Sequence, residues 1–162
     1  MTYATRVLMA ATIALGSAFA SAEEQAAAPA SMLGHWSSDC DAWGVPATCT
    51  ATWSVGKHQS HLVQDYAISR QADGVQIFAG RGLYRFDNAA VDGVWEDSRG
   101  VIQHLSGTYD NGQLKVIWGD AQTEIGRSIY TFDDNVLSVR DAVLTDQGWR
   151  EFMSIDYAPP AG

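Results

Sequence analysis

Hydrophobic and polar residues alternate along most of this chain in short segments, which turn-forming residues separate every 8 to 14 positions. No segment of helical length carries an apolar stripe with a period of 3.6 residues. Alternation with a period of two is typical of half-buried β-strands. The pattern therefore predicts ten strands, over residues 33–39, 48–55, 61–70, 75–86, 91–97, 101–109, 113–118, 124–132, 136–143 and 149–157.

The residues between these segments favour tight hairpins. Asn111-Gly112 is the strongest hairpin signal, because both residues readily adopt the positive φ that a two-residue turn requires. About ten antiparallel strands exceed what one open sheet comfortably holds. Consecutive short hairpins favour closure into a barrel. We therefore predict an all-β fold, an up-and-down antiparallel barrel of about ten strands. A barrel of this size encloses either packed side chains or room for one small ligand.

The composition of the chain argues against some classes of binding partner. The chain has 162 residues, 46% of them hydrophobic and 18% charged, a balance typical of a globular protein. Ten Lys and Arg stand against 19 Asp and Glu, for a net charge of −9. Without a basic stripe to release counterions, nucleic acid and anionic membrane surfaces are poor partners. We expect a small-molecule ligand instead, and the sequence leaves the oligomeric state open.

The N-terminal segment resembles a secretory signal peptide over residues 1–22. Arg6 precedes an apolar stretch that is too short to span a bilayer. Ala20-Ser21-Ala22 fits the rule of small residues at a cleavage site. We therefore expect a periplasmic or secreted protein that is cleaved near Ala22, with no membrane insertion afterwards. The remaining chain divides into a flexible leader at 23–32, a barrel domain at 33–158 and a tail at 159–162.

The two cysteines fit an oxidising compartment. Cys40 and Cys49 flank a turn-like segment, and we predict a disulfide between them. A metal site is the weaker interpretation, because no further Cys or His pair lies nearby. His58 and His61 have the spacing of a metal pair, but residues three apart near a strand point to different faces. We therefore expect no metal and no cofactor.

Three charged residues occupy strand faces that are otherwise apolar: Arg127, Asp141 and Glu151. Turns centred on Asp134 and Asp146 would place the three side by side, about 5 Å apart and pointing into the barrel. Unpaired buried charge is costly, so such a row is either a self-satisfied ion network or a polar anchor for a ligand. As an anchor, Arg127 would be the fork-shaped donor to a carboxylate, carbonyl or hydroxyl.

Aromatic residues supply the candidate walls of a cavity. Trp95, Trp118 and Trp149 are the expected apolar walls, and Trp36 is expected to plug one end of the barrel. Asp97 shares a strand face with Trp95 and lies at the strand end. It either contributes to ligand binding at the mouth or builds the turn into the next strand.

Short motifs add a resemblance. Leu33-Gly34-His35-Trp36 is similar to the Gly-x-Trp signature of the calycin barrels, which include lipocalins. Across residues 33–157, the order of further motifs resembles a bacterial lipocalin-like family of unknown function. These motifs are Gly80-x-Gly82-x-Tyr84-x-Phe86-Asp87, Trp95-x-Asp97-Ser98, Gly107-Thr108-Tyr109, Thr123-Glu124-x-Gly126-Arg127 and Trp149-Arg150-Glu151. The resemblance implies a calycin-type barrel and no particular activity. Related nitrobindin-type barrels ligate haem through a C-terminal His, and no His follows His104 in this chain.

Three functions remain open. The first is an exported barrel that holds a partly apolar molecule by its polar end. The second is a barrel enzyme, an isomerase, lyase or hydrolase, in which Asp141 and Glu151 form a carboxylate pair. One member of such a pair could act as a general acid, because two neighbouring carboxylates do not both ionise cheaply. The third is a structural barrel filled by its own side chains. The interior volume distinguishes the third from the first two.

Overall fold

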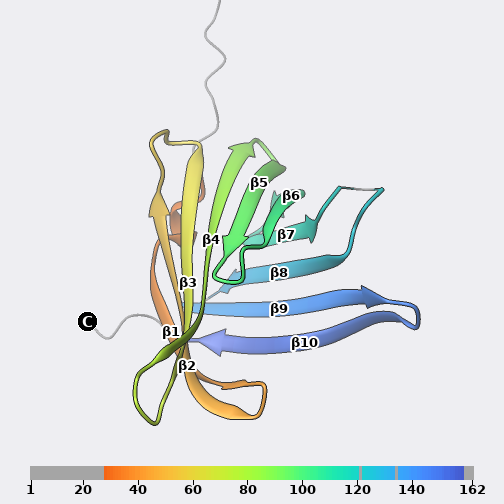
Figure 1. The fold of residues 1–162 in the computed structure, drawn as a ribbon. Helices are drawn as coiled ribbons and strands as arrows, with labels where there is room; N and C mark the ends of the chain where they lie inside the picture. The colour runs from red at the N-terminus through yellow and green to blue at the C-terminus, as the bar shows by residue number, and fades with distance from the viewer. Residues whose placement is uncertain (1–27, 121, 134, 159–162) are drawn as a thin grey trace, which may run out of the picture.

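Ten antiparallel strands form a single sheet in strict chain order (Figure 1). The computed structural model describes residues 28–120, 122–133 and 135–158. The strands are β1 (Gly34–Ala42), β2 (Val45–Val55), β3 (His61–Arg70), β4 (Gln76–Asp87), β5 (Ala90–Asp97), β6 (Ile102–Asp110), β7 (Gln113–Trp118), β8 (Gly126–Asp133), β9 (Val136–Thr145) and β10 (Gly148–Tyr157). The predicted all-β, up-and-down architecture is confirmed. The predicted signal peptide, residues 23–27 of the leader and the tail at 159–162 lie outside the described residues.

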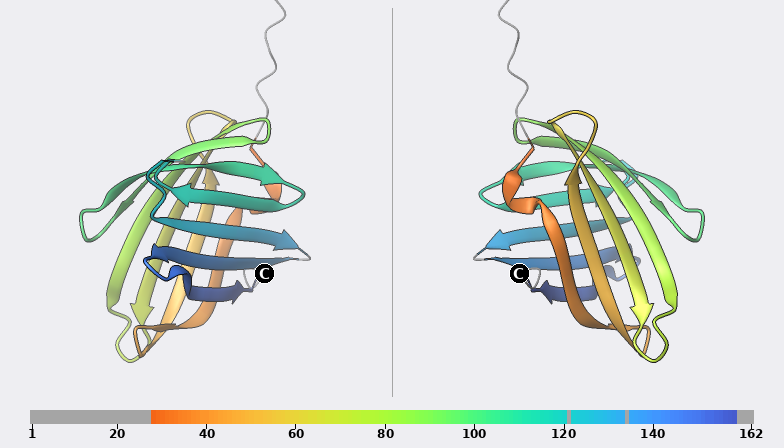
Figure 2. Two further views of the ribbon diagram at one scale, coloured as in Figure 1. Left: turned by 90° about the vertical axis from the view of Figure 1, so that its right-hand side faces the viewer. Right: turned by 90° about the vertical axis from the view of Figure 1, so that its left-hand side faces the viewer.

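The sheet curves until its last strand approaches its first (Figure 2). A bridge pairs Ser37 of β1 with Ala158, which directly follows β10. The result is a nearly closed barrel, in which alternate residues of every strand face the interior. In the described part of the chain, no helix is long and apolar enough to cross a membrane.

The two ends of the barrel differ. At the plugged end, where β1 begins, Trp36 is buried and donates its indole N–H to the carbonyl of Met32 at 3.3 Å. Its ring packs edge-on against Phe132, 6.2 Å between centroids. Met32 is itself fully buried in a short 3₁₀ turn, Ala30–Met32. Residues 28–32 therefore belong to the packed domain, and assigning them to a flexible leader was wrong, because Met32 completes the plug. We call the opposite end, where β1 turns into β2, the open end.

The predicted disulfide is confirmed. Cys40 and Cys49 are bonded across the β1–β2 hairpin, with a Cα–Cα distance of 5.9 Å. The bond indicates an oxidising compartment.

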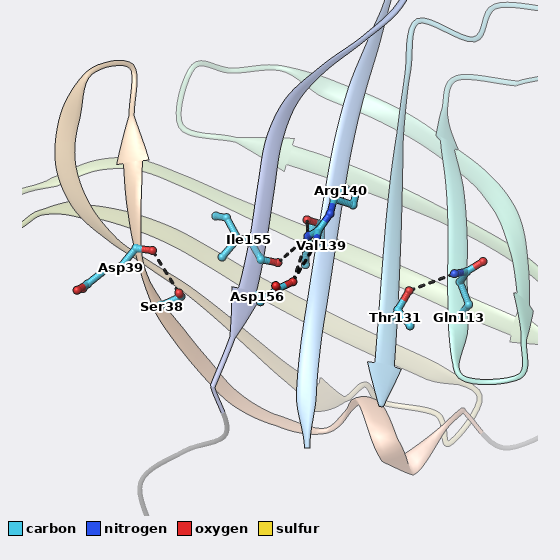
Figure 3. Close-up of polar contacts among 8 residues, drawn as sticks. All are labelled: Ser38, Asp39, Gln113, Thr131, Val139, Arg140, Ile155 and Asp156. Carbon is cyan, nitrogen blue, oxygen red and sulfur yellow. Dashed lines mark hydrogen bonds and ion pairs between the residues drawn. The ribbon is translucent and has the colours of Figure 1, made fainter. Parts of the chain in front are cut away.

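On the outside, polar contacts tie neighbouring strands together (Figure 3). Arg140 of β9 donates to the side chain of Asp156 on β10 at 3.2 Å and to the carbonyl of Ile155 at 3.3 Å. Farther around the barrel, Gln113 of β7 donates to the Thr131 hydroxyl of β8 at 3.1 Å. These contacts stabilise the pairing of β9 with β10 and of β7 with β8.

The predicted charged row does not form, because the register differs by one residue. Arg127 lies opposite Ala142, and Asp141 lies opposite Ser128. On the other side, Glu151 also lies opposite Ala142. A one-residue change of register exchanges the two faces of a strand. Asp141 therefore faces the interior, whereas Arg127 and Glu151 lie on the outer face.

A β-bulge in β10 completes this correction. The register shifts between Glu151 and Met153, so Phe152 is an extra residue without a partner. As a result Met153 is directed inward opposite Asp141, although Trp149 lies outside. The Arg127 guanidinium stacks on the ring of Trp149, 4.1 Å from its centroid. This pair is an outer-surface contact.

Candidate functional site: a cavity inside the barrel

The barrel encloses a cavity of about 570 Å³. Small-molecule sites typically occupy 300–1,000 Å³, so the volume suits one small ligand. Nine aromatic side chains line it, namely Trp43, Tyr66, Phe78, Tyr84, Trp95, Trp118, Tyr130, Phe152 and Tyr157. The lining includes the exposed turn residues Trp43, Arg99 and Val101. The cavity therefore reaches the surface at the open end.

Two inward-facing glycines let tryptophan rings lie flat against the wall. A Cβ atom at Gly80 would clash with the ring of Trp95, and one at Gly126 would clash with the ring of Trp118. Both tryptophans line the cavity. Beside them, the bulge directs Phe152 toward Trp118, with 5.9 Å between the ring centroids. The strands thus build an apolar wall whose shape depends on glycine.

The floor of the cavity is polar, and most of its polar groups already form hydrogen bonds with one another. Gln64 is buried, and its side-chain carbonyl accepts hydrogen bonds from the hydroxyls of Tyr84 at 2.9 Å and Tyr130 at 3.4 Å. Burial raises the pKa of Tyr130 to about 12 and raises the pKa of Tyr84 as well. Both hydroxyls are therefore neutral near pH 7, and their protons are used in the bonds to Gln64.

Asp141 is the only carboxylate among the cavity-lining residues that lies away from the mouth, and it is 7% exposed. Burial raises its pKa to about 7, an effect that hydrogen bonding with Ser128 opposes and the charge of Glu151 reinforces. Ser128 in turn accepts a hydrogen bond from the indole of Trp118 at 3.0 Å. The Oδ1 atom of Asp141 has no hydrogen-bond partner among the described residues.

Two tyrosines near Asp141 retain hydrogen-bonding capacity. The hydroxyl of Tyr157 is buried without a partner among the residues that the structure describes. The hydroxyl of Tyr66 donates to sulfur atoms, Cys49 Sγ at 3.4 Å and Met153 Sδ at 3.5 Å, and it lies close enough to the Tyr157 hydroxyl for each to affect the pKa of the other. Sulfur is a weak acceptor. Burial raises the pKa of both tyrosines, so both remain neutral. The interior therefore presents one carboxylate oxygen and two hydroxyls that a ligand could satisfy.

Asp97 lies at the mouth and holds the β5–β6 turn. Its carboxylate accepts hydrogen bonds from the backbone N–H groups of Arg99 at 2.8 Å and Val101 at 3.3 Å, and from the Arg99 guanidinium at 2.7 Å. Burial would raise the pKa of Asp97, but these donors outweigh it and hold the pKa below its usual range. Asp97 therefore builds this turn, one of the two roles expected for it, and it also lines the cavity.

Of the seven predicted ligand-binding residues, the structure brings four to the cavity: Trp95, Asp97, Trp118 and Asp141. Arg127, Trp149 and Glu151 do not line it, because the register and the bulge place them outside. The carboxylate pair of the enzyme hypothesis is consequently not assembled inside the barrel. Sequence reasoning missed the polar residues Gln64, Tyr66, Tyr84, Ser128, Tyr130 and Tyr157. Their signal was inward alternation with apolar neighbours. In β3, for example, Gln64 and Tyr66 face inward between the apolar residues Leu62 and Ile68.

The histidine pair differs from its prediction. The rings of His58 and His61 lie together at the plugged end, with 5.3 Å between their centroids, and do not point to different faces. The reason is that His61 donates its backbone N–H to the carbonyl of His58, which closes a turn. Within the described ranges, no three His, Cys, Asp or Glu residues are grouped as a metal site requires.

Comparison with known proteins supports the fold alone. No protein-family model matches the chain, and no curated protein matches it. Among solved structures, the chain is similar to the crystal structure of Rv2717c from M. tuberculosis, with a TM-score of 0.64. The two chains are 15% identical, and the match covers 82% of this chain and 94% of Rv2717c. At this identity the similarity shows a shared barrel architecture and no shared activity.

Proposed function

We propose that this protein is an exported small-molecule-binding barrel, which holds a partly apolar molecule with a polar end inside the cavity. The observation that carries the proposal is an aromatic cavity of about 570 Å³ with unpartnered polar atoms on Asp141 and Tyr157. A filled structural barrel would not leave this volume open, so the cavity argues against that alternative.

The aromatic wall would contact the apolar part of a ligand, and the polar atoms would bind its polar end. Trp95 and Trp118 offer apolar surface, and burying such surface contributes about 25 cal/mol per Å². A buried polar group without a partner costs about 1–3 kcal/mol. A ligand whose polar end bonds to Asp141 or Tyr157 would recover that cost. Asp97, which fixes the turn at the mouth, would shape the entrance.

The proposal includes the export of the protein and its relation to the calycin barrels. The signal-like segment at 1–22 and the Cys40–Cys49 disulfide both support a periplasmic or secreted protein. The Gly34-x-Trp36 motif begins β1, and its tryptophan plugs the barrel. This arrangement supports a place among the calycin barrels, the class that the motifs resemble.

A fluorescent probe tests the proposal. N-phenyl-1-naphthylamine is uncharged and apolar at neutral pH, and it gains fluorescence in apolar surroundings. We expect saturable binding of one probe per chain. Val143→Trp should abolish it, because Val143 lines the cavity and the larger ring fills that space.

The matched control is Val94→Trp, which places the same ring on the outer face, where Val94 is 41% exposed. It should bind the probe like the original protein. Circular dichroism should show that both variants are folded. Equal probe binding by the two folded variants, or no saturable binding by the original protein, would contradict the proposal.

A further inference from the structure

The charge inside the cavity is unbalanced. Asp141 is buried in the wall, and among the described residues no Lys or Arg forms an ion pair with it. The cationic residues in the lining, Arg99 and Arg150, are exposed and belong to the open end. Arg99 is already bonded to Asp97 at 2.7 Å. A buried carboxylate is normally paired with a cation or with several donors. Asp141 lacks the cation.

Hydrogen bonding at Asp141 is also incomplete. Ser128 faces it from β8, but the Oδ1 atom has no partner among the described residues. Around it, Tyr157 presents a buried hydroxyl that meets no hydrogen-bond geometry with the described residues, and Tyr66 presents one that donates to sulfur atoms. A group with several N–H donors could bond to all three oxygens at once.

The surrounding walls favour a positive charge. Tyr66 and Trp95 lie beside each other, with 6.4 Å between ring centroids, and Trp118 and Tyr157 complete the aromatic lining near Asp141. Aromatic faces attract cations through their quadrupole, most strongly when water is excluded. A buried carboxylate beside aromatic faces is the combination that recognises organic ammonium ions.

We propose that the cavity selects an organic amine in its ammonium form, with the charged nitrogen at Asp141 and its apolar part against Trp95 and Trp118. This inference rests on the proposed function and specifies its ligand class. The ammonium would donate to Asp141 Oδ1 and to the hydroxyls of Tyr157 and Tyr66. An anion would meet the carboxylate of Asp141 and be repelled. A neutral alcohol would satisfy one oxygen but gain no charge attraction.

Among the groups that face Asp141, the ionisation of Asp141 itself should control how tightly the cavity binds an amine. These groups are Ser128 and Tyr130 from β8, Met153 and Tyr157 from β10, Tyr66 from β3 and Tyr84 from β4, with the Glu151 carboxylate adding its charge from the outer face. The tyrosines stay neutral near pH 7, so the charge inside this part of the cavity changes with the ionisation of Asp141. Amine affinity should therefore rise from pH 5 to pH 8.

Three probes of similar shape test the proposal by isothermal titration calorimetry: 2-phenylethylamine, 2-phenylethanol and phenylacetate. At pH 8 we expect the amine to bind at least about tenfold more tightly than the alcohol, since hydrogen bonds to charged groups are the stronger ones. Phenylacetate should bind most weakly. At pH 5 the preference for the amine should fall, because Asp141 is then protonated.

Two variants locate the selectivity. Asp141→Asn should reduce the amine preference to less than about threefold while the alcohol binds as before, because only the charged interaction is lost. Tyr157→Phe, which removes one hydroxyl, should weaken the amine more than the alcohol and serves if the first variant does not fold. Asp92→Asn removes an exposed outer carboxylate and should leave the amine preference unchanged.

The outcomes separate the two proposals. If the alcohol or phenylacetate binds as tightly as the amine, the ammonium inference is wrong and the binding barrel stands. An amine preference that survives unchanged in Asp141→Asn also overturns the inference. If none of the three probes binds, and N-phenyl-1-naphthylamine does not bind either, both proposals fail.

Discussion

Asp141 should make the stability of this protein depend on pH in an unusual direction. Its pKa in the folded chain is about 7, whereas the ordinary value is 3.8. The folded state therefore holds the proton more tightly than the unfolded chain does. A group of this kind destabilises the fold progressively as pH rises from about 4 to about 7, and its effect is constant above that range.

The magnitude follows from the shift. Each unit of pKa corresponds to about 1.36 kcal/mol, so the ionised carboxylate costs about 4 kcal/mol in full at pH 8. At pH 5 the same linkage gives a cost of about 2 kcal/mol, because most unfolded chains are already ionised there. Asp141→Asn removes this titration and keeps the shape of the side chain. The difference in unfolding free energy between Asp141→Asn and the original protein should therefore grow by about 2–3 kcal/mol from pH 5 to pH 8, in favour of the variant.

Urea unfolding, followed by tryptophan fluorescence on ligand-free, disulfide-bonded protein, measures this difference. Comparing the two proteins at each pH cancels the titration of all other groups. Asp92→Asn, at an exposed position that pairs with Arg85, controls for the loss of one negative charge and should follow the original protein. If the gap between Asp141→Asn and the original protein is the same at pH 5 and pH 8, Asp141 does not titrate as a buried carboxylate, and the reasoning is refuted.

Three further substitutions test other parts of the structure. Arg127→Leu should leave probe affinity within about twofold, because the guanidinium stacks on Trp149 outside the barrel; a tenfold loss in the probe titration would return Arg127 to the site. Replacing both Cys40 and Cys49 by Ser should lower the unfolding free energy by about 2–3 kcal/mol, and unchanged urea unfolding would argue against a stabilising disulfide. Gly126→Ala should displace the Trp118 ring at a cost of about 1–3 kcal/mol and shift its fluorescence; unaltered stability and emission would contradict the close approach.

The strands were predictable because their signals are local. Observed strand bounds differ from the predicted ones by at most three residues. The Asn111-Gly112 turn illustrates why, since both residues adopt positive φ, 47° and 76°, and join Asp110 directly to Gln113. Period-two alternation and turn chemistry together define a meander, and they do so without knowledge of tertiary contacts.

The charged row was not predictable in the same way, because register depends on single residues. Asp133 pairs with Val136, which moves Arg127 opposite Ala142 and out of the interior. The bulge at Phe152 has no signal in the alternation, which runs smoothly through Trp149, Glu151 and Met153 in the sequence. One extra residue reverses every side chain beyond it.

The polar residues on the floor of the cavity could not be recognised from the sequence either. Tyr66, Tyr84, Tyr130 and Tyr157 alternate inward like core residues, so each was consistent with simple packing. Whether such side chains fill the barrel or surround a cavity depends on how ten strands curve together. That property belongs to the whole sheet and not to any segment of the sequence.

The most direct test of the binding barrel is native mass spectrometry of the protein recovered from the exported fraction of its own cells. We expect a chain that lacks the signal peptide, carries one disulfide and retains a small molecule that denaturation releases. The Val143→Trp variant, prepared in the same way, should lack that molecule. If the original protein and the folded variant show the same species, either both with the extra mass or both as the bare chain, the barrel does not hold a ligand in this cavity.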